Sequence, residues 1–388
     1  MRREAELLLC SARVCMDSEQ RARVVTLLQG NIDWDYLLRM SRVHGLAPLL
    51  YQSLDQIRSE AVPETVRNQL RDYCSSNTRR NLHLTSELFK LLNVFEAHGI
   101  RAIPYKGPVL AASVYGNLAL REFCDLDILV HSKDVPRAKD LLVSQGYQSS
   151  FHLANPQETA FLRERCEYTL WNAEEDLLVE IQWNIVPRYF SFDLDFERLW
   201  GRTVPVSIGG RHVLTLSPED SLLILCVHGA KHLWNRLEWI CGVAELIRIS
   251  GSLNWNQVLD DARRLGAQRM LFLGLFLARE LFEAVLPADV LERTQADPLV
   301  KSLSSQVCEK LFREDDNSYG IVESAMFHLK AKERSKDRIR YCFGLVVTPN
   351  VEDWETISLP SYLSFLYYPL RAVRLAKKYK PTPAESTQ

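Results

Sequence analysis

The spacing of the apolar residues changes near residue 99, and this change constrains the fold more than any other feature of the chain. Before that point apolar residues recur every three or four positions, which is typical of one face of a helix. The clearest set is Leu84, Leu88, Leu91, Leu92 and Phe95. Gly99 then marks a helix end. Beyond it the pattern becomes short and alternating, so we expect a helical N-terminal part followed by a segment that forms a sheet.

A strand, a turn and a short helix follow closely after Gly99. Residues 100–105 form an apolar run typical of a strand, and residues 106–108 form a turn that contains glycine and proline. Residues 109–115 have the pattern of a short helix that begins at a proline. This order of elements predicts an α/β core.

Two alternating segments carry acidic residues. Residues 125–130 and 177–183 alternate between polar and apolar side chains, which predicts two strands. Asp125 and Asp127 share one face of the first, and Glu180 lies opposite the apolar residues of the second. Converging carboxylates repel each other unless cations lie between them, and Mg²⁺ prefers such oxygen ligands. The alternative is structural: Asp125 caps a turn, and the other two carboxylates face solvent.

The rest of the chain is predicted to be mainly helical. Residues 204–216 predict a hairpin around Gly209 and Gly210, and a helix-start signature at 217–220 begins a series of helices that runs to about residue 379. We therefore predict an α+β fold. Its parts are an N-terminal helical region (1–84), an α/β core (85–216), a C-terminal helical domain (217–380) and a frayed tail (381–388).

Composition and charge exclude several classes of protein. The 47 Lys and Arg residues against 49 Asp and Glu residues leave a net charge of −2, without the basic field that binds long duplex nucleic acid. The nine cysteines include no Cys-x-x-Cys pair, which predicts reduced thiols and a cytoplasmic location. No apolar run approaches the ~20 residues of a membrane span, so no membrane partner is expected.

Several separated motifs occur in an order that points to one family. The core motifs are Lys106-Gly107-Pro108-Val109-Leu110, Tyr115-Gly116, Arg121 and Asp125-Leu126-Asp127-Ile128-Leu129-Val130. Further motifs lie on either side, at 34–38, 44–51 and 228–239. Together they resemble the uncharacterised nucleotidyltransferase family of the DNA polymerase beta-like superfamily, over nearly the whole chain.

The resemblance implies a small mixed-sheet nucleotidyltransferase core flanked by helical regions. It also implies transfer of NMP from an NTP to a hydroxyl or phosphate acceptor by a two-metal mechanism. Asp125 and Asp127 would bind both ions and Glu180 the ion that activates the acceptor, with Mg²⁺ or Mn²⁺ as the metal. Two cations on the attacking and leaving oxygens are well suited to in-line displacement at phosphorus.

Three residues near the glycine turn are expected to contact the nucleotide. Gly107 would let backbone N–H groups approach phosphate oxygens near a helix N-terminus, and Lys106 would add a positive charge. Lys106 is alternatively a solvated turn residue. Arg121 either reaches a phosphate or pairs with an aspartate to orient it.

A second set of expected contacts lies on the helix that follows the hairpin. By resemblance, His228, Lys231, His232 and Trp234 line a substrate cleft between the α/β core and the C-terminal helices; the alternative is a hydrogen-bonded helix face packed on the core. The i, i+4 histidines also have a zinc-compatible spacing, but the Glu of a zinc-binding protease helix is missing between them.

Partners and alternatives follow from the remaining residues. The family commonly has His where Gln182 stands and a carboxylate where Gly242 stands, so contacts to nucleotide or acceptor differ here. The acceptor classes are a small metabolite, an antibiotic, a peptide, a protein side chain or an RNA end. The basic C-terminal run at 371–380 either binds RNA or an acidic partner or is a solvated helix face, which is the more frequent case. The alternative function is a catalytically silent nucleotide-binding or partner-binding module.

Overall fold

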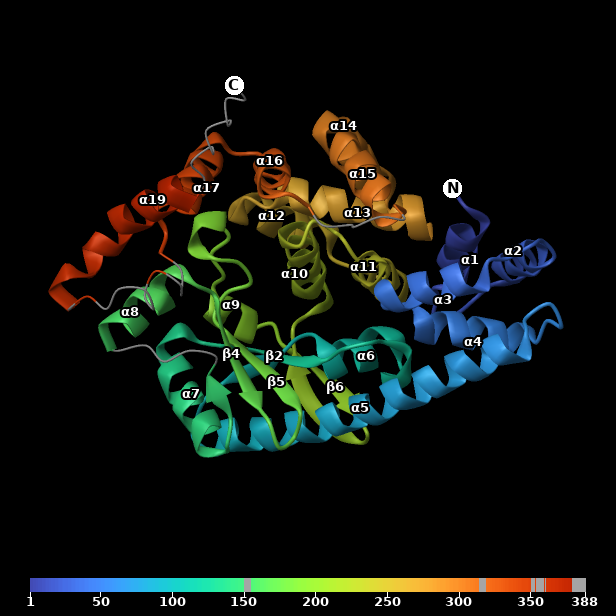
Figure 1. The fold of residues 1–388 in the computed structure, drawn as a ribbon, viewed down its shortest axis with the longest axis horizontal. Coiled ribbons are helices and arrows are strands. Elements are labelled where there is room, and N and C mark those ends of the chain that lie inside the picture. Colours follow the sequence, from blue (N-terminus) through green and yellow to red (C-terminus); the bar gives the residue numbers. More distant parts are fainter. Residues whose placement is uncertain (150–154, 314–318, 350–352, 354–358, 360, 379–388) are drawn as a thin grey trace, which may run out of the picture.

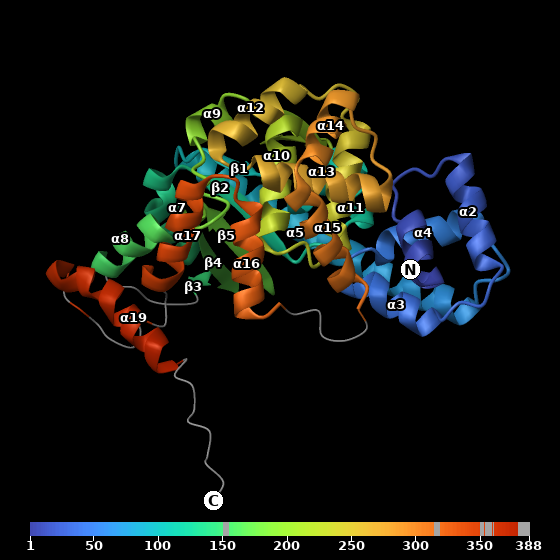
Figure 2. The ribbon, with the colours of Figure 1, turned by 90° about the horizontal axis from the view of Figure 1, so that it is seen from above.

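The computed structural model describes residues 1–149, 155–313, 319–349, 353, 359 and 361–378. Most of these residues are helical, and a small mixed sheet lies among them (Figure 1). The N-terminal helices lie at one end of the molecule, and the helices from α10 onward cover one side of the sheet (Figure 2). The predicted α+β class is confirmed.

The N-terminal part consists of five helices. They are α1 (Arg3–Ser11), α2 (Ser18–Leu28), α3 (Trp34–Val43), α4 (Ala47–Ile57) and α5 (Glu64–Ala97). Asp17 and Asp33 cap α2 and α3 by accepting backbone N–H groups of the first turn. The 34 residues of α5 make it about 50 Å long, and it continues from the N-terminal helices along the sheet (Figure 1). The predicted boundary between residues 84 and 85 therefore falls inside one helix.

The main sheet has five strands in the order β1-β2-β5-β4-β3. They are β1 (Ala102–Pro104), β2 (Asp125–Val130), β3 (Gln148–Ser149), β4 (Glu167–Asn172) and β5 (Leu177–Gln182). The pair β2 and β5 is parallel, and all the other pairs are antiparallel. A separate hairpin contains β6 (Val204–Ile208) and β7 (Arg211–Thr215). Strands β3 and β4 are the two that the sequence analysis did not anticipate.

Short helices connect these strands, and longer ones follow them. The connecting helices are α6 (Gly107–Tyr115), α7 (Val135–Ser144), α8 (Asn155–Glu164) and α9 (Phe196–Trp200), with 3₁₀ turns η1 (Leu118–Leu120), η2 (Ser132–Asp134) and η3 (Arg188–Phe190). The C-terminal elements are α10 (Pro218–Lys231), α11 (Leu237–Ile249), α12 (Trp255–Leu265), α13 (Gln268–Phe282), α14 (Ala288–Ala296), α15 (Pro298–Leu311), α16 (Ile321–Ala331), α17 (Ser335–Val347), η4 (Ser361–Leu366) and α19 (Tyr367–Lys378). A membrane span needs a long apolar helix, and the described part of the chain contains none.

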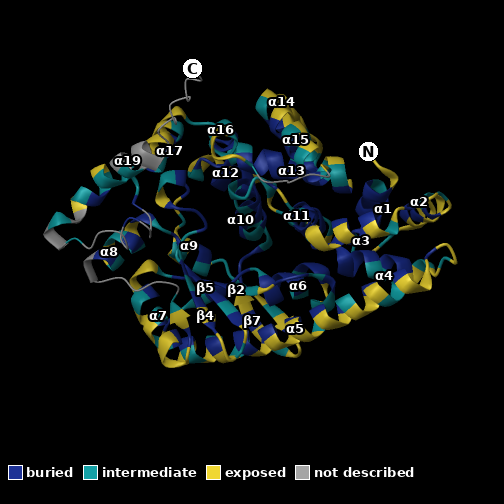
Figure 3. Cartoon of the chain, viewed as in Figure 1, coloured by how far each residue is buried: buried dark blue, intermediate teal, exposed yellow. Residues whose placement is uncertain are grey.

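The two faces of the sheet belong to different apolar cores. Ile128 and Val179 pack with Leu88 of α5 and with α7 in one core. Leu129, which points the other way, joins the larger core that contains α10, α11 and α13. Figure 3 shows the outer side of α5 as mostly exposed, while α10 lies in the buried middle of the molecule. The alternation of side chains along β2 therefore turns its aspartates toward α10.

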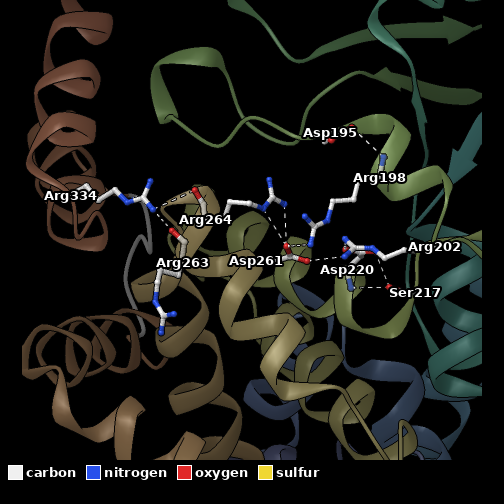
Figure 4. A network of polar contacts seen from close by, with 9 residues as sticks. All are labelled: Asp195, Arg198, Arg202, Ser217, Asp220, Asp261, Arg263, Arg264 and Arg334. Atoms are coloured by element: carbon white, nitrogen blue, oxygen red, sulfur yellow. Dashed lines mark hydrogen bonds and ion pairs between the residues drawn. The ribbon is translucent and has the colours of Figure 1, made fainter.

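A network of ion pairs joins the segment after α9 to α10 and α12 (Figure 4). Arg202 Nη1 lies 2.9 Å from Asp261 Oδ2, and the same guanidinium pairs with Asp220. Asp261 Oδ1 also receives Arg198 Nη2 at 2.7 Å and Arg264 Nη2 at 3.1 Å. We call this group the Asp261 network. It fixes the C-terminal helices against the end of the α/β core.

The described arginines of the basic C-terminal run make contacts within the chain. Arg371 and Arg374 pair with Asp353 at 3.0 and 2.6 Å. Tyr367 is buried, and the Tyr368 hydroxyl lies 3.3 Å from Glu164 Oε1. These contacts favour the structural interpretation of the run. The end of the run at 379–380 and the tail predicted at 381–388 lie outside the described residues.

Candidate active site

The register of two parallel strands brings the predicted carboxylates together. Asp127 of β2 pairs directly with Glu180 of β5, and Asp125 lies two residues before Asp127 on the same face. The chain runs from β2 through α7, β3, α8 and β4 before it returns as β5 beside β2. The three carboxylates thus share the face of the sheet that α10 covers.

The loop that leads into β2 is fixed from below by α5. The buried side chains of Asn77 and Asn81 both donate to the backbone carbonyl of Arg121, at 3.2 and 2.8 Å. Gly107 begins α6 with a φ of +50°, and a Cβ there would lie 3.4 Å from the Asp125 carbonyl oxygen. Glycine at this position therefore permits the close approach of α6 to β2. Gly107 supports the site from behind and does not line its cavity.

The carboxylates line a cavity of about 490 Å³. Its walls come from the sheet, from the Arg121 loop, from α10 and α11, and from helices α3 and α5. Of the predicted site residues, the lining includes Lys106, Arg121, Asp125, Asp127, Glu180, His228, Lys231 and His232. The expected cleft between the core and the C-terminal helices is therefore present, and the N-terminal helices complete it.

Polar contacts organise the carboxylates inside the cavity. Lys106 Nζ lies 2.8 Å from Asp127 Oδ1, so Lys106 is an ion-pair partner rather than a solvated turn residue. Gln182 Nε2 donates to Asp127 Oδ1 at 3.0 Å and to Glu180 Oε2 at 2.7 Å. The Tyr105 hydroxyl donates to Gln182 Oε1 and thereby orients the amide. Gln182, which the resemblance marked as a departure from the family pattern, is thus part of the carboxylate cluster.

The charge of the carboxylates is only partly compensated. Burial and the neighbouring charge of Asp127 raise the pKa of Asp125 above its ordinary value. Burial, Asp127 and Glu167 raise the pKa of Glu180 to about 7. Lys106 opposes both shifts without cancelling them. A hard divalent cation bound to such buried oxygen donors would favour their ionised form and neutralise their charge.

The spacing of the three carboxylates does not by itself form a finished ion-binding cage. Within the described residues, one group has ligand atoms that all lie within 4.8 Å of one another, namely His83, Glu87 and Glu175, and it lies away from the cavity. Lys106 and Gln182 hold Asp127 and Glu180 in their present positions. The donor set fits a cation, and its arrangement requires the Lys106 and Gln182 contacts to loosen when one binds.

The two histidines on α10 form an aromatic wall. The ring centroid of His228 lies 4.6 Å from that of His232 and 5.3 Å from that of Trp239. Burial and the charge of Lys106 hold the pKa of His228 well below its usual value, and burial and Lys231 lower that of His232 to about 3. Both rings are therefore neutral near pH 7. Lys231 Nζ lies 3.4 Å from Glu167 Oε2 and from the Ile185 carbonyl oxygen.

Trp234 is a correction to the expected cleft lining. Its side chain is fully buried, and it packs where a Cβ on Gly229 would lie 2.5 Å and one on Gly274 3.0 Å from the indole. Two consecutive left-handed residues, Leu233 and Trp234, turn the chain after α10 and direct the indole inward. Trp234 is a core residue between α10 and α13, and Trp239 provides the indole that lines the cavity.

The outer end of the cavity consists of residues that sequence reasoning missed. They are Arg42 of α3, Tyr73 and Arg80 of α5, and Arg236 and Glu238 at the start of α11. Arg236 and Glu238 lie within the motif at 228–239, where no role was expected for them, and the other three residues meet them because the N-terminal helices pack beside the start of α11. Gly242, the other departure from the family pattern, does not line the cavity, and a Cβ there would lie 3.6 Å from the Tyr115 hydroxyl.

Comparison with known proteins agrees with this arrangement. A family model described as an uncharacterised nucleotidyltransferase matches residues 30–283, which is more than half of the chain. The chain therefore belongs to this uncharacterised nucleotidyltransferase family. No curated protein matches the chain.

Proposed function

We propose that this protein is a metal-dependent nucleotidyltransferase that moves NMP from an NTP to a hydroxyl or phosphate acceptor. The observation that supports this most strongly is the pairing of Asp127 with Glu180 across parallel strands, with Asp125 on the same face and a cavity above them. Family membership supports nucleotidyl transfer in general. The metal, its two-ion arrangement and the acceptor class belong to the proposal.

The roles of the residues follow from their positions. Asp125 and Asp127 would hold both ions and Glu180 one of them; when bound, divalent cations supply charge for the attacking and leaving oxygens. Lys106, at the N-terminus of α6, pairs with Asp127 and would turn from it to the phosphates to neutralise their charge. Lys231 supplies a second cation, which burial disfavours but nearby Cys166 and the carboxylates of Glu167 and Glu180 stabilise by raising its pKa.

The reaction is a displacement at phosphorus. The acceptor oxygen forms a bond to the α-phosphorus, the bond from that phosphorus to the β-phosphate oxygen breaks, and pyrophosphate leaves with the electron pair. The proton of a hydroxyl acceptor passes to solvent. The neutral rings of His228 and His232 lie beside Trp239 and offer a flat surface for a nucleobase without adding charge.

One observation favours the alternative of a catalytically silent nucleotide-binding module. Asp127 Oδ1 already receives both Lys106 and Gln182, which occupies the oxygen at the centre of the cluster. In a silent module these contacts would persist, and nucleotide would bind without reaction. In an enzyme, Lys106 would move from Asp127 to the phosphates.

Pyrophosphate release separates the two functions. The protein is incubated with each of the four labelled NTPs and a deproteinised cell extract, with Mg²⁺, Mn²⁺ or EDTA. We expect release of pyrophosphate and a mass increase of one NMP on an acceptor, both abolished by EDTA. Binding of NTP with neither product, under every metal condition and with every NTP, would support the silent module instead.

A further inference from the structure

We infer that the acceptor carries a phosphate monoester, and that the four arginines at the outer end of the cavity form a subsite for that phosphate, separate from the site of the NTP phosphates. This inference rests on the proposed function and adds the chemical class of the acceptor. The arginines are Arg42, Arg80, Arg121 and Arg236, which come from α3, α5, the loop before β2 and the residue before α11.

The cavity has two ends with different cations. Lys106 pairs with Asp127, and Lys231 lies beside Glu167, at the end that contains the sheet carboxylates. At the other end the Arg42 guanidinium lies 5.1 Å from the centroid of the Tyr73 ring. The Tyr73 hydroxyl donates to Glu122 Oε2 at 2.8 Å, which ties this ring to the Arg121 loop.

Contacts and charge effects on neighbouring groups assign the cations to the same two ends of the cavity. The charges of Arg80 and Arg236 lower the pKa of Glu122 against a larger effect of burial. Lys106 and Lys231 belong to the carboxylate end, where their Nζ atoms lie 2.8 Å from Asp127 Oδ1 and 3.4 Å from Glu167 Oε2. Arg121 belongs to the outer end, because the next residue, Glu122, accepts the Tyr73 hydroxyl at 2.8 Å.

The outer end holds more positive than negative charge. Its two carboxylates are Glu122 and Glu238. Burial raises the pKa of Glu122, and burial raises that of Glu238 to about 7. Against four arginines, which stay charged at all ordinary pH values, these leave an excess of about two positive charges. A phosphate monoester carries nearly the same charge with the opposite sign.

The unpaired polar atoms at this end include both a donor suited to a phosphate oxygen and acceptors suited to a neighbouring hydroxyl group. Arg121 Nη1 is a buried donor with no hydrogen-bond partner among the described residues. Glu122 Oε1 and Glu238 Oε2 are buried acceptors in the same condition. Guanidinium groups recognise phosphate oxygens by paired hydrogen bonds, and free carboxylate oxygens accept hydroxyl groups of a polyol. A cavity of about 490 Å³ suits small molecules rather than the body of a polymer.

The test uses two probes at once. Inorganic phosphate and glycerol 3-phosphate are titrated calorimetrically into the full-length protein, alone and after saturation with Mg²⁺ and the best-binding α,β-methylene NTP. We expect both probes to bind in the presence of the analogue. Arg42→Ala and Arg80→Ala should each weaken phosphate binding by roughly tenfold and leave the affinity for the analogue unchanged. Lys106→Ala should have the opposite selectivity.

Arg79→Ala is the matched control, since Arg79 is exposed, precedes Arg80 on α5 and does not line the cavity. Arg42 and Arg80 are also exposed, so their variants should fold, which unchanged thermal unfolding would verify. Competition between phosphate and the analogue, or loss of analogue affinity in Arg80→Ala, would assign the arginines to the NTP and overturn the inference. Transfer to a 5′-phosphorylated oligonucleotide but to no small phosphate ester would overturn the size argument. Arginine-dependent phosphate binding without any analogue binding would contradict the proposed function and leave the subsite standing.

Discussion

The cavity and the Asp261 network both gather buried carboxylates, but they compensate their charge differently. In the network Asp261 receives three guanidinium groups, and although burial works against ionisation, hydrogen bonds from Arg202 and Arg264 lower its pKa. In the cavity Glu180 receives, among the described residues, only an amide from Gln182, and burial and the charge of Asp127 raise its pKa to about 7.

This difference distinguishes a structural cluster from a candidate site. Carboxylates that hold elements together are paired with cations from the same chain. Those of the cavity have negative charge that the chain does not neutralise and that a bound cation can neutralise. Asp220 is intermediate: burial raises its pKa despite the ion pair with Arg202. Substitutions in the two clusters should therefore have opposite consequences for stability and activity.

The largest expected effect is on turnover. Asp127→Asn should reduce pyrophosphate release by at least about a thousandfold, because it removes a charged ligand at the centre of the cluster. Asp261→Asn, measured at a temperature where it remains folded, should change kcat/KM less than about threefold. Steady-state kinetics of both variants provide the measurement. Retention of more than about a tenth of the activity by Asp127→Asn would contradict the assignment.

The next effect is on stability. Arg202→Ala should lower the free energy of unfolding by about 3–5 kcal/mol, because Asp220 and Asp261 both lose a partner in a buried environment. Urea denaturation measures this change. Arg263→Ala is the control, since its ion pair with Asp260 is exposed and should contribute about 0.5 kcal/mol or less. A loss below about 1 kcal/mol for Arg202→Ala would mean that the network does not hold these helices together.

A smaller effect should have the opposite sign. With its pKa raised from 4.5 to about 7, Glu180 keeps its proton in the folded protein where the unfolded chain has lost it. Its contribution to stability therefore falls as the pH rises from 4.5 to 7 and stays unfavourable above. Glu180→Gln should raise the free energy of unfolding by about 1–3 kcal/mol at pH 8 in EDTA.

The pH dependence provides the check on this prediction. At pH 4 the carboxyl is protonated in both states, so the gain from Glu180→Gln should disappear. Glu174→Gln, an exposed change in the turn between β4 and β5, should alter stability little at either pH. Denaturation curves that show a loss at pH 8, or the same gain at both values, would disprove the electrostatic explanation.

The smallest effect concerns substrate binding. Lys231→Ala should raise KM about tenfold for one substrate and change kcat little. The reason is that the Lys231 ammonium lines the cavity from α10 and contacts Glu167 rather than Asp127, where the reaction is proposed to occur. Lys336→Ala, on the exposed side of α17, is the control. A fall in kcat at constant KM would place Lys231 in transition-state stabilisation instead.

Much of this arrangement follows from local sequence patterns. The alternation in β2 predicts the common face of Asp125 and Asp127, and the structure shows that strand at Asp125–Val130. The turn at Lys106 and Gly107 and the helix that carries His228 were also predictable, because each depends on neighbouring residues. Strand β3 has only two residues, and the alternating burial of β4 is hidden in the sequence because its exposed Trp171 is apolar and its buried Asn172 is polar, so both escaped prediction.

The remaining parts depend on contacts between distant segments. Gln182 was recognised only as a departure from the family pattern, yet its amide bridges Asp127 and Glu180. Trp234 was expected in the cleft from the family resemblance, but the two left-handed residues that turn it inward have no sequence signal. The outer end of the cavity depends on how α3 and α5 pack, which the spacing of apolar residues along the sequence does not encode.

The continuity of α5 has a consequence for insertions and deletions. Arg80 faces the cavity, and Leu84 and Leu88, one and two turns later, pack in the core of the sheet. Each residue of a helix advances about 1.5 Å and turns about 100°. A single deletion between Arg80 and Leu84 would therefore rotate the arginine away from the cavity while the sheet held the rest of the helix in place. The number of residues between Arg80 and Leu84 is therefore fixed, because α5 must present one side chain to the cavity and the other to the core of the sheet.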